Sequence, residues 1–132
     1  MKRFVINRAT WANANTTNES MLLNPKTGLM CCLGQICHQA KTPKKELAFK
    51  YEPSEIGIRV NYLDDLLKGN KEFAWPSVAP FVRHWFADVA MNINDNEMLT
   101  PRERERELKN LFKDKGIELS FVGRLPRMKL TD

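Results

Sequence analysis

The chain has no long apolar run, few histidines and few cysteines, and each shortage argues against a class of protein. No stretch approaches the roughly 20 apolar residues that cross a bilayer as a helix. After Met1-Lys2-Arg3 only the short segment from Phe4 to Asn7 precedes Arg8, so no secretory signal region is expected. The three cysteines cannot all pair within one chain. We therefore expect a protein of the reducing cytoplasm, without a membrane partner.

The sequence also lacks the short motifs that mark common catalytic and cofactor sites. It contains no Walker loop, no Rossmann glycine pattern, and no HExxH, GxSxG or deaminase-type Cys/His pattern. Because ordinary nucleotide hydrolysis uses a glycine-rich loop around the phosphates, that reaction is not expected. No cofactor is predicted, and binding is favoured over catalysis.

Positive charge exceeds negative charge only mildly, with 21 basic against 16 acidic side chains and a net charge of +5. Basic and acidic residues alternate from Arg102 to Glu107, which we interpret as a solvated helix face with internal ion pairs. Unbalanced basic residues occur in two other segments, and four of them are predicted to contact phosphate or a protein partner: Lys44, Lys45, Arg124 and Arg127. Neither segment interleaves aromatic residues for base stacking, so nucleic acid is the weaker alternative.

Periodicity and capping residues predict a single compact α+β domain over residues 1–122, followed by a basic, irregular tail over 123–132. A small sheet of about three short strands is expected, at Phe4–Ile6, Ile56–Val60 and Ile117–Phe121. Four or five helices are expected to pack against it, at 28–39, 43–49, 62–68, after Pro76, and at 101–115.

The helix after Pro76 has the strongest apolar stripe of the chain. Its apolar side chains recur at helical spacing: Val78, Phe81, Val82, Trp85, Phe86 and Val89. Trp85 is thereby predicted to lie in the core, so that Trp85→Asp should unfold the domain. Residues 92–99 are predicted to be a polar connection, and a capping box from Thr100 to Glu103 then begins the last helix.

All three cysteines and one of the two histidines lie in the segment 28–38. Zinc sites usually pair ligands two to four residues apart, twice over, and this segment does not, so no metal is expected. On the predicted helix Cys32 packs in the core, whereas Cys31 and His38 flank Gly34 on a second face. The glycine would let a neighbouring backbone or a ligand approach closely.

A catalytic interpretation of the same segment stays open as an alternative. The dipole of the predicted helix would lower the pKa of the Cys31 thiol, and His84 could serve as its base. The protein would then be a small cysteine-dependent enzyme.

Polar segments supply the candidate ligand-binding residues. Residues 8–25 are rich in Asn, Thr and Ser, and the tryptophan within them either anchors this loop or stacks on a ligand. The predicted ligand contacts are Trp11, Gln35, His38, Asn94 and Asp95. The segment 92–103 echoes a calcium-binding EF-hand loop, but its first place is Asn92 instead of Asp and Glu97 stands where the sharp turn requires glycine, so calcium is not expected.

Two groups of segments resemble a family of small phage and prophage proteins with a Cys-Cys-Leu-Gly segment. The first group is Ser20-Met21-Leu22-Leu23 with the stretch from Gly28 to Gly34, and the second is Ile93-Asn94-Asp95, Arg102-Glu103, Phe112 and Gly116-Ile117. The resemblance covers most of residues 10–122 and supplies no catalytic residue. It implies a viral protein of the bacterial cytoplasm that binds a host protein or a small signalling molecule.

These observations favour a non-enzymatic, phage-encoded accessory protein that binds a host protein or a nucleotide-like signal, for example to inhibit a host defence function. The alternatives are an enzyme that uses Cys31 and a nucleic-acid-binding protein that uses the basic segments. Homo-oligomer formation is left open.

Overall fold

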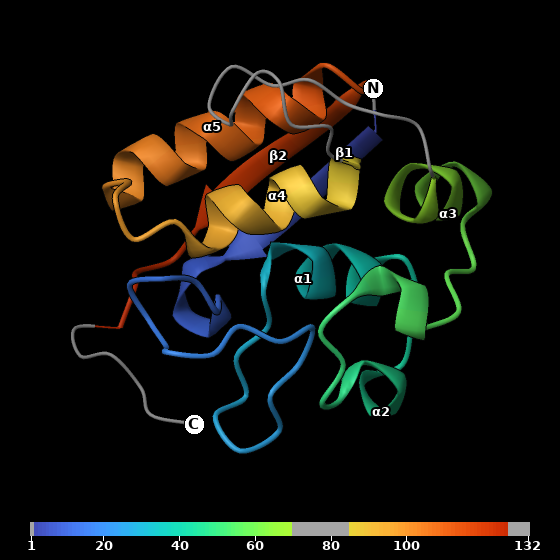
Figure 1. Cartoon of the computed structure of the whole chain (residues 1–132), viewed down its shortest axis with the longest axis horizontal. Coiled ribbons are helices and arrows are strands. Elements are labelled where there is room, and N and C mark those ends of the chain that lie inside the picture. Colours follow the sequence, from blue (N-terminus) through green and yellow to red (C-terminus); the bar gives the residue numbers. More distant parts are fainter. Residues whose placement is uncertain (1, 70–84, 127–132) are drawn as a thin grey trace.

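Figure 1 shows the computed structural model of the chain, which describes residues 2–69 and 85–126. The fold is α+β, as predicted. In chain order the elements are β1 (Lys2–Asn7), a 3₁₀ turn (Arg8–Thr10), α1 (Cys32–Gln39), α2 (Lys44–Leu47), a 3₁₀ turn (Pro53–Glu55), α3 (Asn61–Lys68), α4 (Phe86–Asp95), α5 (Pro101–Lys113) and β2 (Ile117–Val122). None of the helices in the described ranges is long and apolar enough to cross a membrane.

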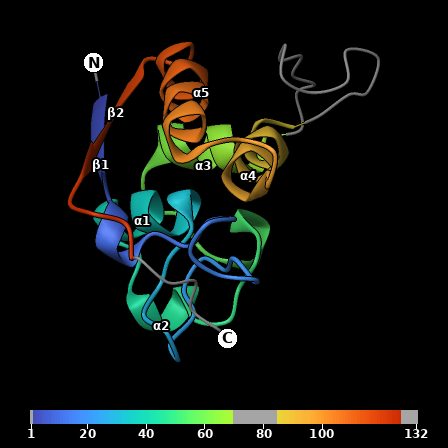
Figure 2. The ribbon, with the colours of Figure 1, turned by 90° about the vertical axis from the view of Figure 1, so that its left-hand side faces the viewer.

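The strands β1 and β2 form a parallel two-stranded sheet, with Lys2 opposite Ile117 and Asn7 opposite Val122. The helices lie on one side of this sheet (Figure 2). Side chains on that side are buried: Phe4, Ile6, Ile117 and Leu119. On the other side Val5 is 43% exposed and Val122 is 47% exposed. The alternation of burial thus follows the period of two that a strand imposes on its side chains.

Two glutamines of α1 close the outer edge of β1. The side-chain amide of Gln39 accepts from the backbone N–H of Val5 at 2.8 Å and donates to the carbonyl of the same residue. The side-chain amide of Gln35 likewise accepts from the backbone N–H of Asn7 at 2.7 Å and donates to the Asn7 carbonyl at 3.1 Å. Each amide therefore makes the hydrogen bonds that one residue of a neighbouring strand would make. The outward backbone groups of Val5 and Asn7 are thus satisfied without a further strand.

The predicted strand Ile56–Val60 is wrong. Its alternating pattern is real, since Ile56 is buried while Gly57 and Arg59 are exposed. A strand also needs a partner edge; the edge of β1 is taken by Gln35 and Gln39, and the segment does not pair with β2. The segment instead runs as an irregular connection between the 3₁₀ turn at Pro53–Glu55 and α3.

The first helix begins later than predicted, at Cys32 instead of Gly28. Gly28 has a φ of +75° and forms a turn, and the residues that follow it make isolated bridges to other segments, Leu29 to Asn24 and Met30 to Trp11. These tertiary contacts extend the chain where local propensity favoured a helix. The helix then starts where Cys31 acts as its N-cap.

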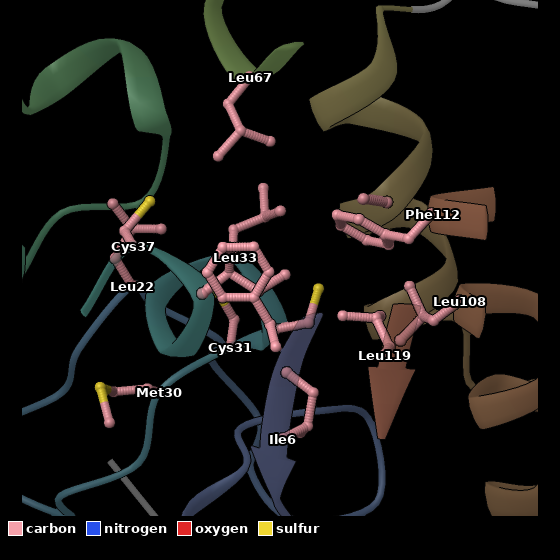
Figure 3. Packing of buried hydrophobic residues seen from close by; sticks show 14 of the residues in the cluster. Ile6, Leu22, Met30, Cys31, Leu33, Cys37, Leu67, Leu108, Phe112 and Leu119 are labelled. Atoms are coloured by element: carbon pink, nitrogen blue, oxygen red, sulfur yellow. The ribbon is translucent and has the colours of Figure 1, made fainter. Parts of the chain in front are cut away.

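Helix α1 crosses the middle of the core, which Figure 3 shows from close by. Leu33 and Ile36 of this helix are fully buried, as are Leu108 and Phe112 of α5. Phe112 also meets Phe86 of α4 edge to face, with 5.0 Å between the ring centroids. The single apolar cluster therefore ties the sheet to α1, α4 and α5.

Gly34 permits close packing of α1 on a neighbouring backbone, one of the two interpretations of this glycine. A Cβ atom at this position would overlap the carbonyl group of Leu22. The segment before α1 therefore lies directly on the helix surface, and the glycine is required there by space.

Trp85 is not the core residue that its position in the apolar stripe predicted. Its side chain is 50% exposed, and α4 begins only at Phe86, which is 4% exposed. The earlier part of the predicted stripe lies outside the described residues. Helix α4 also continues to Asp95, so the first half of the predicted polar connection is helical.

The last helix and strand confirm their predictions. The Thr100 hydroxyl accepts from the Glu103 N–H at 3.1 Å, and the Glu103 carboxylate accepts from the Thr100 N–H at 2.9 Å. Gly116, with a φ of +76°, makes the turn from α5 into β2. Residues 123–126 of the predicted tail form no helix or strand.

Candidate functional site

Trp11 and Asn94, both predicted ligand contacts, are fully buried and bound to each other. The Trp11 indole N–H donates to the Asn94 side-chain oxygen at 2.8 Å. The same oxygen accepts from the Cys32 backbone N–H at 3.2 Å, and the Asn94 amide nitrogen donates to the Ala12 carbonyl at 2.8 Å. This arrangement fits the anchoring interpretation of Trp11, because both side chains hold the loop after β1 against α1 and α4.

Asp95 lies next to this buried pair but faces outward. Its carboxylate accepts from the Asn94 side-chain amide at 2.8 Å. Partial withdrawal from water raises the pKa of Asp95, while hydrogen bonds from Asn94 and Ser20 oppose the shift. The residue as a whole is exposed, so solvent screens the carboxylate and the shift has little weight.

The other two predicted ligand contacts lie elsewhere. Gln35 closes the edge of β1, and the His38 ring nitrogen Nδ1 lies 3.1 Å from the carbonyl of Thr42. The structure therefore brings Trp11, Asn94 and Asp95 together and leaves Gln35 and His38 out of that group.

The three thiols have raised pKa values, whereas an activated thiol has a lowered one. Cys31 is fully buried, and this burial raises its pKa to about 12, although the Gly34 N–H donates to its sulfur at 3.4 Å. Burial likewise raises the pKa of Cys37 to about 12 and that of Cys32 well above its ordinary value. The predicted lowering of the Cys31 pKa is therefore wrong, and its proposed base His84 lies outside the described residues.

No group of three or more potential metal ligands occurs within residues 2–69 and 85–126. The predicted basic contacts do not converge either. Lys44 and Lys45 are exposed on α2, and Arg124 is exposed just after β2. Arg127 lies outside the described residues.

Helix α5 separates the charges that alternate in its sequence. A turn of 3.6 residues places Arg102, Arg106, Lys109 and Lys113 along one line of the helix, and all four side chains are exposed. We call this line the basic face. No ion pair forms to any of these side chains among the described residues.

Arg104, in the middle of the alternating segment, belongs to the interior. It is 0% exposed, and its guanidinium donates to the carbonyls of Asn96 at 2.7 Å and Leu99 at 3.2 Å and to the side chain of Asn15. Burial lowers the pKa of Arg104. One of the three arginines in the segment is therefore structural and does not balance the surface acids.

Glu105 directly precedes Arg106 of the basic face, and Arg8 neutralises it. The guanidinium of Arg8 makes two parallel hydrogen bonds to the Glu105 carboxylate, at 2.8 Å and 2.7 Å. These bonds raise the pKa of Arg8, and a third bond runs to the carbonyl of Gly123 at 3.1 Å. The pair fixes the residue after β1 to α5 and keeps the Glu105 carboxylate from pairing with the neighbouring cations.

A hollow of about 450 Å³ lies over this part of the molecule. It is lined by Arg8, Arg102, Glu105, Arg106, Lys109 and Asn110. We call it the basic hollow. Guanidinium and ammonium groups on one surface provide the hydrogen-bond donors that phosphate oxygens accept, and Arg offers them in a fork that matches a phosphate.

These residues were not among the predicted contacts, because the alternation of charge from Arg102 to Glu107 indicated a solvated helix face with internal ion pairs. Spacing by three and four within the capped helix was the signal that could have found the basic face. The burial of Arg104 and the pairing of Glu105 with Arg8 had no local signal, since both depend on distant segments.

No protein-family model, no curated protein and no solved structure matches this chain. The candidate site therefore rests on its geometry and charge alone.

Proposed function

We propose that this chain is a non-enzymatic binding protein that takes a phosphate-bearing ligand in the basic hollow on α5. The observation that carries the proposal is the line of Arg102, Arg106 and Lys109 beside an acid that Arg8 already neutralises. Seven residues of helix separate the first and last of these cations by roughly 10 Å, which is a distance that two or three linked phosphate groups can cover.

The chemistry of the hollow supports binding over catalysis. Its side chains are cations, a paired carboxylate and an amide, so the set contains neither a nucleophile nor an unpaired base. The predicted resemblance to small phage proteins agrees with this proposal, because a nucleotide-like host signal would present the same phosphate oxygens.

Calorimetry with the full chain tests the proposal against pyrophosphate, linear and cyclic nucleotides, and a nucleoside without phosphate. The double variant Arg102→Gln/Arg106→Gln should weaken binding of a phosphate ligand roughly 100-fold or more, since each charge-assisted hydrogen bond contributes about 1.5–3 kcal/mol. Both side chains are exposed, so the variant should fold normally.

The matched control is Lys44→Gln/Lys45→Gln, which removes the same charge from exposed positions on α2. It should leave the affinity within a few fold. Equal losses in both double variants would show attraction by net charge only, and no binding of any phosphate compound would remove the proposal.

Nucleic acid is the second candidate, because the basic face continues along α5 to Lys113. A strand following that face would contact several phosphates, and its affinity would fall steeply with salt. A small nucleotide that binds more tightly than an oligonucleotide at physiological salt would decide against this second candidate.

A further inference from the structure

The outer edge of β2 carries backbone groups that nothing in the described chain pairs with. The Lys2 N–H donates to the Gly116 carbonyl at 3.3 Å, and Lys2 lies opposite Ile117 in the parallel register. In this register the N–H and C=O groups of Ile117, Leu119 and Phe121 point away from β1. Within the described ranges, these groups have no hydrogen-bond partner.

The two edges of this small sheet thus differ in whether their outward backbone groups are hydrogen-bonded. Gln35 and Gln39 occupy the edge of β1 with side-chain amides, so that edge cannot accept a strand. The edge of β2 offers a row of free donors and acceptors, which is the template for adding an extended segment. A two-stranded sheet gains stability when a further strand joins it.

The surroundings of this edge indicate what kind of segment would fit. On the helix side, the Lys109 ammonium lies 5.7 Å from the ring centroid of Phe121 and the Arg8 guanidinium lies 6.0 Å from it. On the solvent side, β2 presents Glu118, whose carboxylate pairs with Arg3 at 2.7 Å, then Ser120 and the exposed Val122. The helix side is therefore positive near Phe121, and the solvent side is partly apolar at its Val122 end, with the charge of Glu118 already paired.

We propose that the edge of β2 binds an extended segment of a partner protein in which acidic and β-branched residues alternate. Side chains of successive residues point to opposite faces, so the acidic ones would face Lys109 while the β-branched ones would lie beside Val122. A second copy of this chain fits less well, because it would bring its own α5, with the same cations, to this edge.

The test uses the isotope-labelled full chain and a peptide of roughly eight residues, the length of an ordinary strand, with alternating Glu and Val. The peptide should bind and slow hydrogen exchange at the amides of Ile117, Leu119 and Phe121 about tenfold or more. The same peptide with N-methyl groups on the amides of one edge keeps its charge but cannot pair along that edge. It should bind at least about tenfold more weakly.

Charge at the edge is tested separately. Lys109→Glu should weaken binding of the Glu/Val peptide, whereas the same charge change at Lys26→Glu, an exposed position outside both proposed sites, should not. A Lys/Val peptide should bind more weakly than the Glu/Val peptide. Equal binding of the N-methylated peptide, or no binding at millimolar concentration, would overturn the proposal. Concentration-dependent self-association that protects the same three amides would also overturn it, in favour of a second copy.

The edge and the basic hollow share only Lys109 and Arg8, so the two proposals can fail independently. Arg102→Gln/Arg106→Gln should weaken phosphate binding roughly 100-fold or more and leave peptide binding at the edge nearly unchanged. Loss of both activities in that variant would assign the peptide to the hollow and overturn strand addition.

Discussion

The indole nitrogen of Trp11 donates a hydrogen bond of 2.8 Å to the side-chain oxygen of Asn94, which is 83 positions later in the chain. Asn94 also receives the first N–H of α1, from Cys32, and donates to the carbonyl of Ala12. One buried amide therefore holds the N-terminal loop, the start of α1 and the end of α4 in a single arrangement.

Asn94→Ala should lower the free energy of unfolding by about 2–4 kcal/mol, because it leaves the buried donors of Trp11 and Cys32 without their acceptor. Urea unfolding followed by tryptophan fluorescence measures the change. The exposed Asn92, on the same helix, is the matched control, and Asn92→Ala should change stability by less than about 0.5 kcal/mol. Similar losses at both positions would contradict a special role for Asn94.

Gly34→Ala should destabilise the protein strongly, by about 3 kcal/mol or more, because the added methyl group overlaps rigid backbone at Leu22. Gly57→Ala is its control, since a Cβ there meets nothing within 4 Å. That variant should be neutral or slightly stabilising through the entropy of the unfolded chain. Thermal unfolding distinguishes the two, and a stable Gly34→Ala protein would mean that the segment at Leu22 moves freely.

The buried thiols should make stability depend on pH in the alkaline range. Burial raises the pKa of Cys31 and Cys37 from the ordinary 9.0 to about 12 in the folded state. Below pH 9 the thiols are protonated in both states and the folded protein is unaffected. Above pH 9 the unfolded chain gains stability by losing these protons, so the free energy of unfolding should fall as pH rises toward 12.

The same burial predicts slow reaction of the thiols with an alkylating probe at neutral pH until denaturant is added. Mass spectrometry after brief labelling measures it residue by residue. Fast modification of Cys31 in the folded protein at pH 7 would return the cysteine-dependent enzyme to consideration.

Trp85→Asp should cost about 1 kcal/mol or less, because half of the side chain is already in solvent. Phe86→Ala, one residue later, should cost about 3–5 kcal/mol, since that ring is buried against Phe112. Comparing the urea midpoints of the two variants tests where α4 turns its apolar surface. The reverse order would show that the stripe predicted from the sequence continues through Trp85.

The sequence predicted correctly those elements whose ends depend on residues close together in the chain. The capping box at Thr100 and Glu103, and the glycine that ends the turn before β2, depend on residues within one helix and its end. The close approach at Gly34 could also be predicted, because a glycine on a helix face marks a place where another chain segment can lie.

The errors fall where a distant segment decides the outcome. Ile56–Val60 has the pattern of a strand but pairs with neither strand of the sheet, and at the edge of β1 Gln35 and Gln39 already occupy the backbone groups. The start of α1 is displaced by the bridge between Met30 and Trp11. The candidate site was missed for a related reason, since only the fold shows that Arg104 points inward and that Arg8 pairs with Glu105.

The register of the sheet also has a consequence for how this chain folds during synthesis. The first strand pairs with residues 117–122, so it stays without its partner while nearly the whole described chain is made. The sheet can then close only after β2 has left the ribosome. Contacts so distant in sequence fold slowly, and an unpaired β1 is exposed to aggregation until then. Because Gln35 and Gln39 are synthesised long before β2, they can cover one edge of β1 during that interval.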